Sequence, residues 1–92
     1  MKKYKKIVAI QGDALQTINP RTDTTLLLAI EAQRRGYKIY YYETKNLTFS
    51  NNFVYALTKQ IKFYENKKNF YSLKDVKLLN LSSADFILMR QN

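Results

Sequence analysis

The chain has 92 residues, a formal net charge of +9, 46% hydrophobic residues and 14% aromatic residues. This composition is typical of one small packed domain and argues against intrinsic disorder. No run of the sequence approaches the roughly 20 apolar residues needed to span a bilayer. Cys and His are both absent, which removes disulfides, thiolate metal sites and the commonest general base.

The N-terminal half predicts a strand, a helix and a second strand. Residues 4–10 end in a continuous apolar run, which is typical of a strand buried in a parallel sheet, and a loop follows to residue 21. We expect a helix from Thr22 or Asp23, either of which can cap it, to Gly36, which can adopt the left-handed stop. The second strand is residues 38–43. The inward helix face is predicted to hold Leu26, Leu27, Ala29, Ile30 and Gln33.

The C-terminal half predicts a hairpin and a third parallel strand. Residues 47–58 form two β-favouring runs around Asn51-Asn52, which suits a two-residue turn, and residues 60–71 continue with antiparallel strand and loop. In residues 72–81 the apolar positions have helical spacing, so one or two helical turns are predicted. The continuous apolar run at residues 86–90 predicts another buried parallel strand.

These elements predict an α/β domain with a mainly parallel sheet, one long helix and an inserted β-hairpin region. A parallel sheet is normally covered on both faces, and a single helix covers only one. We therefore expect a missing partner, either further chain or another subunit. One interpretation is a stand-alone protein-docking module.

The positive charge invites a second alternative, a small basic nucleic-acid-binding module. Twelve of the sixteen basic residues are Lys and they are spread along the chain, whereas specific base readout relies on Arg. We therefore interpret the charge as a solvated basic surface. In the nucleic-acid alternative, the stacking residues are Tyr40–Tyr42, Phe63, Tyr64, Phe70 and Tyr71.

The residues themselves predict little chemistry within this chain. It has two glycines and lacks every common glycine-rich phosphate-binding motif, and none of its seven acids has metal-site spacing. No catalytic residue and no metal site are predicted. The apolar stretch Ile7–Ile10 is too short for a secretory signal, so we expect a cytoplasmic protein.

Five blocks stand out in order along the chain: Asp13-Ala14-Leu15, Ile18-Asn19, Asp23-Thr24-Thr25, Glu31-Ala32-Gln33-Arg34-Arg35-Gly36-Tyr37 and Ile87-Leu88-Met89-Arg90. Together these blocks resemble the N-terminal domain of the prokaryotic glutathione synthetase family. In that family Pro takes the place of Ala14, and an acidic residue takes the place of Asn92.

The resemblance implies a small three-layer Rossmann-like (pre-ATP-grasp) domain over residues 1–92, with the ATP-grasp domains outside this chain. The full-length parent would be an ATP-dependent carboxylate–amine ligase that uses Mg²⁺ and ATP to join γ-glutamylcysteine and glycine through an acyl phosphate. This fragment alone would be inactive and bind no cofactor. Its partners would be the remaining ATP-grasp domains and further copies of itself in a homo-oligomer, with no nucleic acid or membrane.

The same resemblance implies which residues face the substrate. The loop after the first strand and the end of the last strand should line the cleft, as carboxyl ends of parallel strands usually do. Arg90 would pair with a carboxylate or developing phosphate. Asn19 would orient a peptide-like substrate, and Asp13 is either a substrate contact or a loop residue bonded to its own backbone. Asp23 is expected to be a helix cap.

Overall fold

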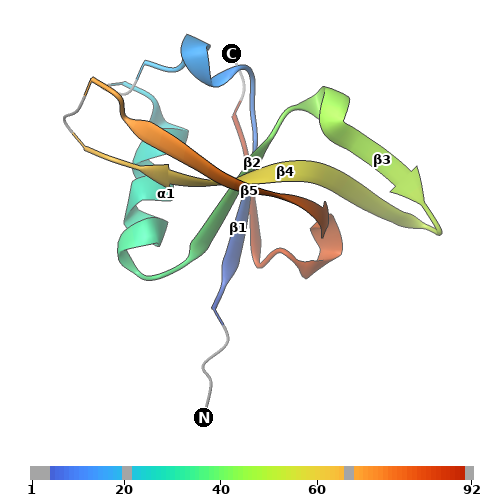
Figure 1. Cartoon of the computed structure of the whole chain (residues 1–92). Helices are drawn as coiled ribbons and strands as arrows, with labels where there is room; N and C mark the ends of the chain where they lie inside the picture. The colour runs from blue at the N-terminus through green and yellow to red at the C-terminus, as the bar shows by residue number, and fades with distance from the viewer. Residues whose placement is uncertain (1–4, 20–21, 66–67, 91–92) are drawn as a thin grey trace.

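The computed structural model describes residues 5–19, 22–65 and 68–90 and shows a curled sheet with one long helix, α1 (Thr24–Arg34) (Figure 1). None of the described residues forms a helix long and apolar enough to cross a membrane. The strands are β1 (Ile7–Gln11), β2 (Lys38–Tyr42), β3 (Leu47–Ser50), β4 (Phe53–Phe63), β5 (Tyr71–Asn80) and β6 (Phe86–Met89). Three short 3-10 turns join them, at η1 (Leu15–Thr17), η2 (Thr44–Asn46) and η3 (Leu81–Ser83).

The centre of the sheet is parallel, as predicted. Strand β1 lies between β2 and β6, with Ile7 paired to Lys38 and Val8 paired to Phe86. The buried position predicted for residues 86–90 is wrong, because Phe86 and Met89 are 49% and 59% exposed. Strand β6 ends the row of paired strands, so the described residues give it one strand neighbour only.

The other pairings are antiparallel, so the sheet is mixed and not mainly parallel. Strand β4 pairs with β2, β3 and β5, and the sheet curls as a half-barrel (Figure 1). The expected three-layer Rossmann-like arrangement is corrected accordingly: within the described residues, one helix covers one face. The hairpin region adds strand β4 to the sheet, beside β2. In the expected three-layer fold, a helix would have formed the third layer.

The predicted helical turns in residues 72–81 are replaced by strand β5, which pairs with β4 along its length. The register shifts between Lys59 and Ile61. Because of this irregularity, Leu73 and Val76 line the same cavity although they are three positions apart. The register shift interrupts the alternation of apolar residues in β5, so their spacing in the sequence is the one typical of a helix.

The hairpin at Asn51-Asn52 is confirmed. Asn51 and Asn52 have φ values of 50° and 68°, the left-handed pair that a type I′ turn requires. The strand-and-loop prediction for residues 60–71 is also confirmed within the described residues, since β4 ends at Phe63 and β5 begins at Tyr71.

The helix begins and ends as predicted. Asp23 caps it by accepting a hydrogen bond from the backbone N–H of Leu26 at 2.9 Å, and Gly36 follows with φ of 86°. Leu26 is buried, but Leu27 is 54% exposed and does not belong to the inward face. Gln33 does face inward: its side-chain amide bonds both backbone groups of Phe63, each at 2.8 Å.

The two faces of the sheet carry separate apolar clusters. The helix-side cluster comprises Val8, Ile10, Ile18, Leu26, Ala29, Ile39, Tyr41, Ile61 and Phe63. The opposite cluster comprises Ala9, Tyr40, Tyr42, Ala56 and Leu79. Alternate residues of β1 and β2 thus face opposite sides, as the pleat of a strand requires. This packing fixes the carboxyl ends of the parallel strands, where the candidate site lies.

Candidate functional site

The site lies where β1, β2 and β6 end, which is the usual ligand-binding edge of a parallel sheet. Arg90 follows β6 directly, and its backbone N–H donates to the carbonyl of Gln11 at 2.8 Å, so it stands beside the end of β1. Asp13 follows β1 after one glycine, and Asp23 stands at the start of α1. Three charged residues from distant parts of the sequence therefore meet.

Arg90 connects the two carboxylates. Its Nε donates a hydrogen bond to Oδ2 of Asp23, and its Nη1 lies 3.6 Å from Oδ2 of Asp13. The side chains of Arg90 and Asp23 are 11% and 9% exposed, whereas that of Asp13 is 52% exposed. The hydrogen bond to Asp23 raises the pKa of Arg90 above its ordinary value, so the guanidinium stays charged. Asp13 forms the solvent-facing side of the cluster.

Tyr41 holds the loop that carries Asp13. Its hydroxyl donates to the carbonyl oxygen of Asp13 at 2.6 Å, and the backbone N–H of Gly12 donates to the carbonyl of Tyr42 at 3.1 Å. A Cβ on Gly12 would stand 2.3 Å from the Tyr41 hydroxyl oxygen, so the Tyr41 side chain would have to shift to admit any other residue there. Burial raises the pKa of Tyr41 to about 12, which keeps the hydroxyl a neutral donor at physiological pH.

The structure brings two of the three predicted site residues, Asp13 and Arg90, side by side. Asn19 joins them through the backbone: its carbonyl accepts from the N–H groups of Thr22 and Asp23 at 3.2 and 3.1 Å. Its side chain is exposed beside the cluster. The structure thus groups the candidates; their contact with a substrate stays a prediction.

Sequence reasoning missed two members of this cluster. Asp23 was predicted as a helix cap, which is confirmed, but its bond to Arg90 spans 67 positions and no local pattern signals it. Tyr41 packs in the core, with 6% of its surface exposed. Its place near the carboxyl end of a predicted strand was the available signal for a site role.

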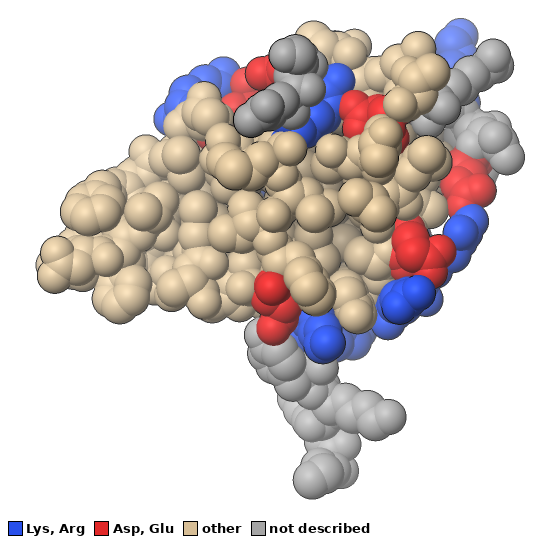
Figure 2. All heavy atoms as spheres, turned by 180° about the vertical axis from the view of Figure 1, so that it is seen from behind, with Lys and Arg blue, Asp and Glu red and all other residues tan. Residues whose placement is uncertain are grey.

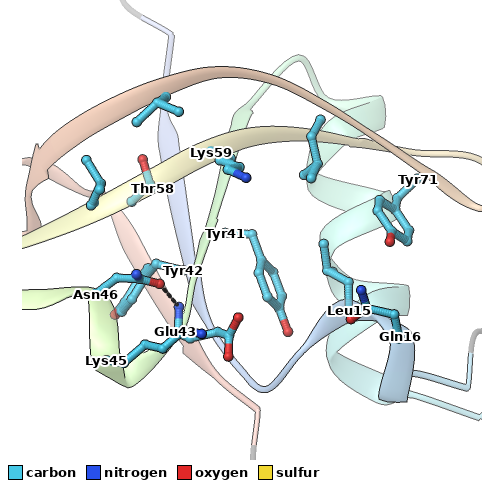
Figure 3. Close-up of a pocket in the computed structure, with 13 residues that line it drawn as sticks. Leu15, Gln16, Tyr41, Tyr42, Glu43, Lys45, Asn46, Thr58, Lys59 and Tyr71 are labelled. Atoms are coloured by element: carbon cyan, nitrogen blue, oxygen red, sulfur yellow. Dashed lines mark hydrogen bonds between the residues drawn. The ribbon is translucent and has the colours of Figure 1, made fainter.

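A cavity of about 340 Å³ adjoins the cluster at the end of β2 (Figure 3). Tyr41 belongs to both, and in Figure 3 the side chains of Tyr41, Glu43 and Lys59 point toward the same space. The backbone N–H of Glu43 donates to Oδ1 of Asn46 at 3.0 Å, which fixes this part of the rim. The lining residues are Leu15, Gln16, Tyr41, Tyr42, Glu43, Lys45, Asn46, Leu57, Thr58, Lys59, Tyr71, Leu73 and Val76.

The lining combines both charge signs with aromatic and aliphatic side chains, and its size falls in the range of small-molecule pockets. Such a cavity fits a small amphipathic molecule. Within residues 5–19, 22–65 and 68–90, no three His, Cys, Asp or Glu side chains are grouped in a way that could hold a metal.

The nucleic-acid alternative loses most of its stacking platform. Tyr40–Tyr42 and Phe63 are buried, and Phe70 packs edge-on against Tyr71 with ring centroids 5.0 Å apart. On the face shown in Figure 2, basic side chains alternate with acidic ones around the rim, and the β3–β4 end carries no charge. Stacking on Tyr40–Tyr42 and Phe63 would require the sheet to open, so the prediction is wrong for these four rings.

The chain was compared with protein families. The family model described as "Prokaryotic glutathione synthetase, N-terminal domain" matches residues 7–92. The match covers all six strands and the helix of the structure.

Individual relatives agree with the family model. A glutathione synthetase of Buchnera aphidicola subsp. Baizongia pistaciae is 41% identical over 87% of this chain and 25% of its own length. That of Agrobacterium fabrum is 34% identical over 95% of this chain and 27% of its own, and that of Buchnera aphidicola subsp. Schizaphis graminum is 33% identical over 100% and 29%. The chain therefore spans about a quarter of the length of these relatives. The chain therefore belongs to the prokaryotic glutathione synthetase N-terminal domain family.

Proposed function

We propose that this chain is the substrate-side N-terminal domain of a glutathione synthetase, an ATP-grasp ligase that joins γ-glutamylcysteine and glycine. The remaining length of the relatives would supply the ATP-grasp domains, which hold ATP and Mg²⁺. On this proposal the complete enzyme works in the cytoplasm, and the chain alone is inactive. The same proposal makes the parent enzyme an ATP-dependent carboxylate–amine ligase.

The observation that carries this proposal is the Arg90 cluster at the carboxyl edge of the parallel strands. Arg90 is nearly buried and is held in one position by its pairs with two carboxylates. Arg90 does not line the 340 Å³ cavity; Tyr41, which bonds the carbonyl of Asp13, does. A guanidinium held in place in this way stays charged, and charged guanidinium groups bind carboxylates by strong, often bidentate hydrogen bonds. The site therefore supports binding of a carboxylate at a fixed place.

The chemistry requires such a group. The cysteinyl carboxylate of γ-glutamylcysteine is phosphorylated by ATP, the amine of glycine attacks the acyl carbon, and phosphate leaves. We assign to Arg90 the pairing with that carboxylate or with the charge developing on its phosphate. Asn19 would orient the peptide by hydrogen bonds. The ion pair with Asp13 would restrict the positions that the Arg90 guanidinium can adopt. Mg²⁺ would neutralise the phosphates of ATP from the other domains.

The test is a fusion in which these 92 residues replace the matching quarter of the Agrobacterium fabrum relative. We expect ADP formation that depends on both γ-glutamylcysteine and glycine, with glutathione identified by mass spectrometry. The relative should be inactive when its own N-terminal segment is deleted and not replaced. The isolated 92-residue chain should form no ADP.

Arg90→Lys in this fusion should lower kcat/KM by about tenfold to a hundredfold, because an ammonium cannot make a bidentate contact. Arg34→Lys, on the exposed side of α1, is the matched control and should leave kcat/KM unchanged. A folded fusion without turnover, or an Arg90→Lys fusion with full activity, would contradict the proposal.

A further inference from the structure

Strand pairing places three side chains of the 340 Å³ cavity on one face of the sheet. Tyr41 of β2 is paired with Lys59 of β4, so their side chains lie on the same face. Glu43 follows Tyr41 by two positions and has extended backbone, with φ of −106° and ψ of 160°, so its side chain lies on that face as well. In Figure 3 all three point toward the same space.

Glu43 and Lys59 give the cavity one negative and one positive group at a fixed separation. Diagonal neighbours across an antiparallel pair are about 7–8 Å apart, which leaves room for a small charged group between them. Among the described residues, neither side chain forms an ion pair. A capping box with Asn46 orients the Glu43 side chain, and a carboxylate can accept further hydrogen bonds. The two charges therefore suit a zwitterionic ligand.

The rest of the lining limits the shape of such a ligand. Leu15 and Leu73 contribute apolar surface to the same cavity. Methylene groups would pack against this surface, whereas an ammonium and a carboxylate on one carbon atom would be held by Glu43 and Lys59. The fitting ligand is thus an α-amino acid head group on a short aliphatic chain.

Tyr41 connects this cavity to the Arg90 cluster. Its side chain lines the cavity, and it also lines a smaller hollow together with Arg90. Burial has the largest effect on the pKa of Tyr41, but the charges of Arg90 and Glu43 also act on it, so both groups lie near the hydroxyl. A ligand that occupies the cavity can therefore extend past Tyr41 toward Arg90.

We propose that the cavity binds the α-amino acid head of a γ-glutamyl unit, with its ammonium group on Glu43 and its α-carboxylate on Lys59. This inference rests on the proposed function, in which Arg90 pairs with the cysteinyl carboxylate at the other end of the same peptide. The two charged residues then select the γ-linkage. In an α-linked glutamyl peptide, the carbon atom that carries the ammonium has no free carboxylate.

The test is an NMR titration of the isotope-labelled 92-residue chain with three thiol-free peptides. The first is γ-glutamylalanine, which has the complete head group. The second is glutarylalanine, which lacks the ammonium, and the third is γ-aminobutyrylalanine, which lacks the α-carboxylate. We expect γ-glutamylalanine to bind about tenfold more tightly than either truncated peptide, because each of these loses one charged hydrogen bond.

Two variants assign the charges to their partners. Glu43→Gln keeps an acceptor for the capping box but loses the charge, so it should weaken γ-glutamylalanine binding by about tenfold. It should weaken glutarylalanine binding by less than about twofold, since that peptide has no ammonium to lose. Lys59→Met should show the same pattern with γ-aminobutyrylalanine as the insensitive peptide.

The matched control is Lys38→Gln, which removes an exposed lysine where β2 begins, at the opposite end of the strand from Glu43. It should leave the affinity for all three peptides unchanged. Circular dichroism establishes that each variant is folded.

Three results would overturn the inference. One is the absence of chemical-shift changes at Tyr41, Glu43 and Lys59 with millimolar γ-glutamylalanine. Another is equal affinity for the three peptides. The third is a pair of variants that each weaken all three peptides equally, which would indicate a structural effect.

The fusion assay keeps this inference separate from the proposed function. A fusion that forms glutathione, together with any of these three results, would refute the head-group site and leave the proposed function standing. An inactive fusion, together with the expected peptide and variant pattern, would contradict the proposed function and support the head-group site.

Discussion

The carboxylate of Asp23 serves two partners at once. Its Oδ1 accepts the backbone N–H of Leu26 at 2.9 Å, and its Oδ2 accepts from Nε of Arg90, 67 positions further along the chain. One side chain therefore caps the helix and holds the arginine that ends the sheet. The position of Arg90 depends on where α1 begins.

Replacing Asp23 should separate these two roles. Asp23→Asn keeps a good helix cap but removes the charge facing Arg90, so we expect it to lower the free energy of unfolding by about 1–2 kcal/mol. Asp23→Ala loses both roles and should lower it by about 2–4 kcal/mol. Urea denaturation measures both values.

The control for this pair is Arg90→Met, which removes the guanidinium. In the Arg90→Met background, Asp23→Asn should lower the free energy of unfolding by much less than it does when Arg90 is present. The reason is that the two residues are in contact, so their effects are not additive. Equal effects in both backgrounds would show that the carboxylate and the guanidinium are not coupled.

Gly12 should be intolerant of a side chain because of Tyr41. The Cβ of Gly12→Ala would stand 2.3 Å from the Tyr41 hydroxyl oxygen, and the ring must shift. We expect a loss of roughly 1–3 kcal/mol in the free energy of unfolding, measured in urea. Removing the hydroxyl leaves the ring carbon Cζ as the nearest atom, at 3.0 Å. Gly12→Ala should therefore be less damaging in a Tyr41→Phe background, and an equal loss there would disprove the clash.

Because of Tyr41, the free energy of unfolding should fall at alkaline pH. Burial raises its pKa from 10.0 to about 12, so the unfolded chain loses the phenolic proton before the folded one does. Its contribution is complete below pH 10 and is lost as pH rises from 10 to 12, on the order of 2 kcal/mol in all. Tyrosinate absorbance and urea midpoints over this range would follow it. Tyr41→Phe should remove part of this loss of stability. The rest is due to Tyr42, because burial also raises the pKa of Tyr42. An unchanged pH profile in Tyr41→Phe would contradict the assignment.

Gln33 should be a stability determinant although it is polar. Its amide donates to the carbonyl of Phe63 and accepts from the N–H of the same residue, so α1 completes the end of β4. Gln33→Ala leaves both backbone groups without this partner and should reduce the free energy of unfolding by about 1–3 kcal/mol. Gln33→Glu should retain the acceptor and lose the donor. An alanine variant as stable as the parent in urea would refute this role.

Local signals predicted much of the fold. Asp23 and Gly36 bound the helix because a cap and a left-handed stop depend on neighbouring residues. Asn51 and Asn52 marked the hairpin because few residue types adopt positive φ. These features are short-range, and they were confirmed.

Features that depend on distant residues were not predictable in the same way. Strand β5 became apparent only from its pairing with β4, because the register shift near Lys59 interrupts its alternation. Likewise, the apolar run of β6 signals a strand but not its edge position. For the site, Asp13 and Arg90 were proposed from their places after predicted strands, whereas the contacts of Asp23 and Tyr41 required coordinates.

The flanking of β1 by β2 on one side and β6 on the other has a consequence for how the protein folds. Ile7 donates its backbone N–H to the carboxylate of Asp85, 78 positions away, just before the β1–β6 ladder begins. A nascent chain emerges N-terminus first, so this side of β1 finds its neighbour only after the 78 positions that separate Ile7 from Asp85 have been synthesised. Because closing so long a loop is slow, acquisition of the native state should lag behind that of a helical bundle of equal size.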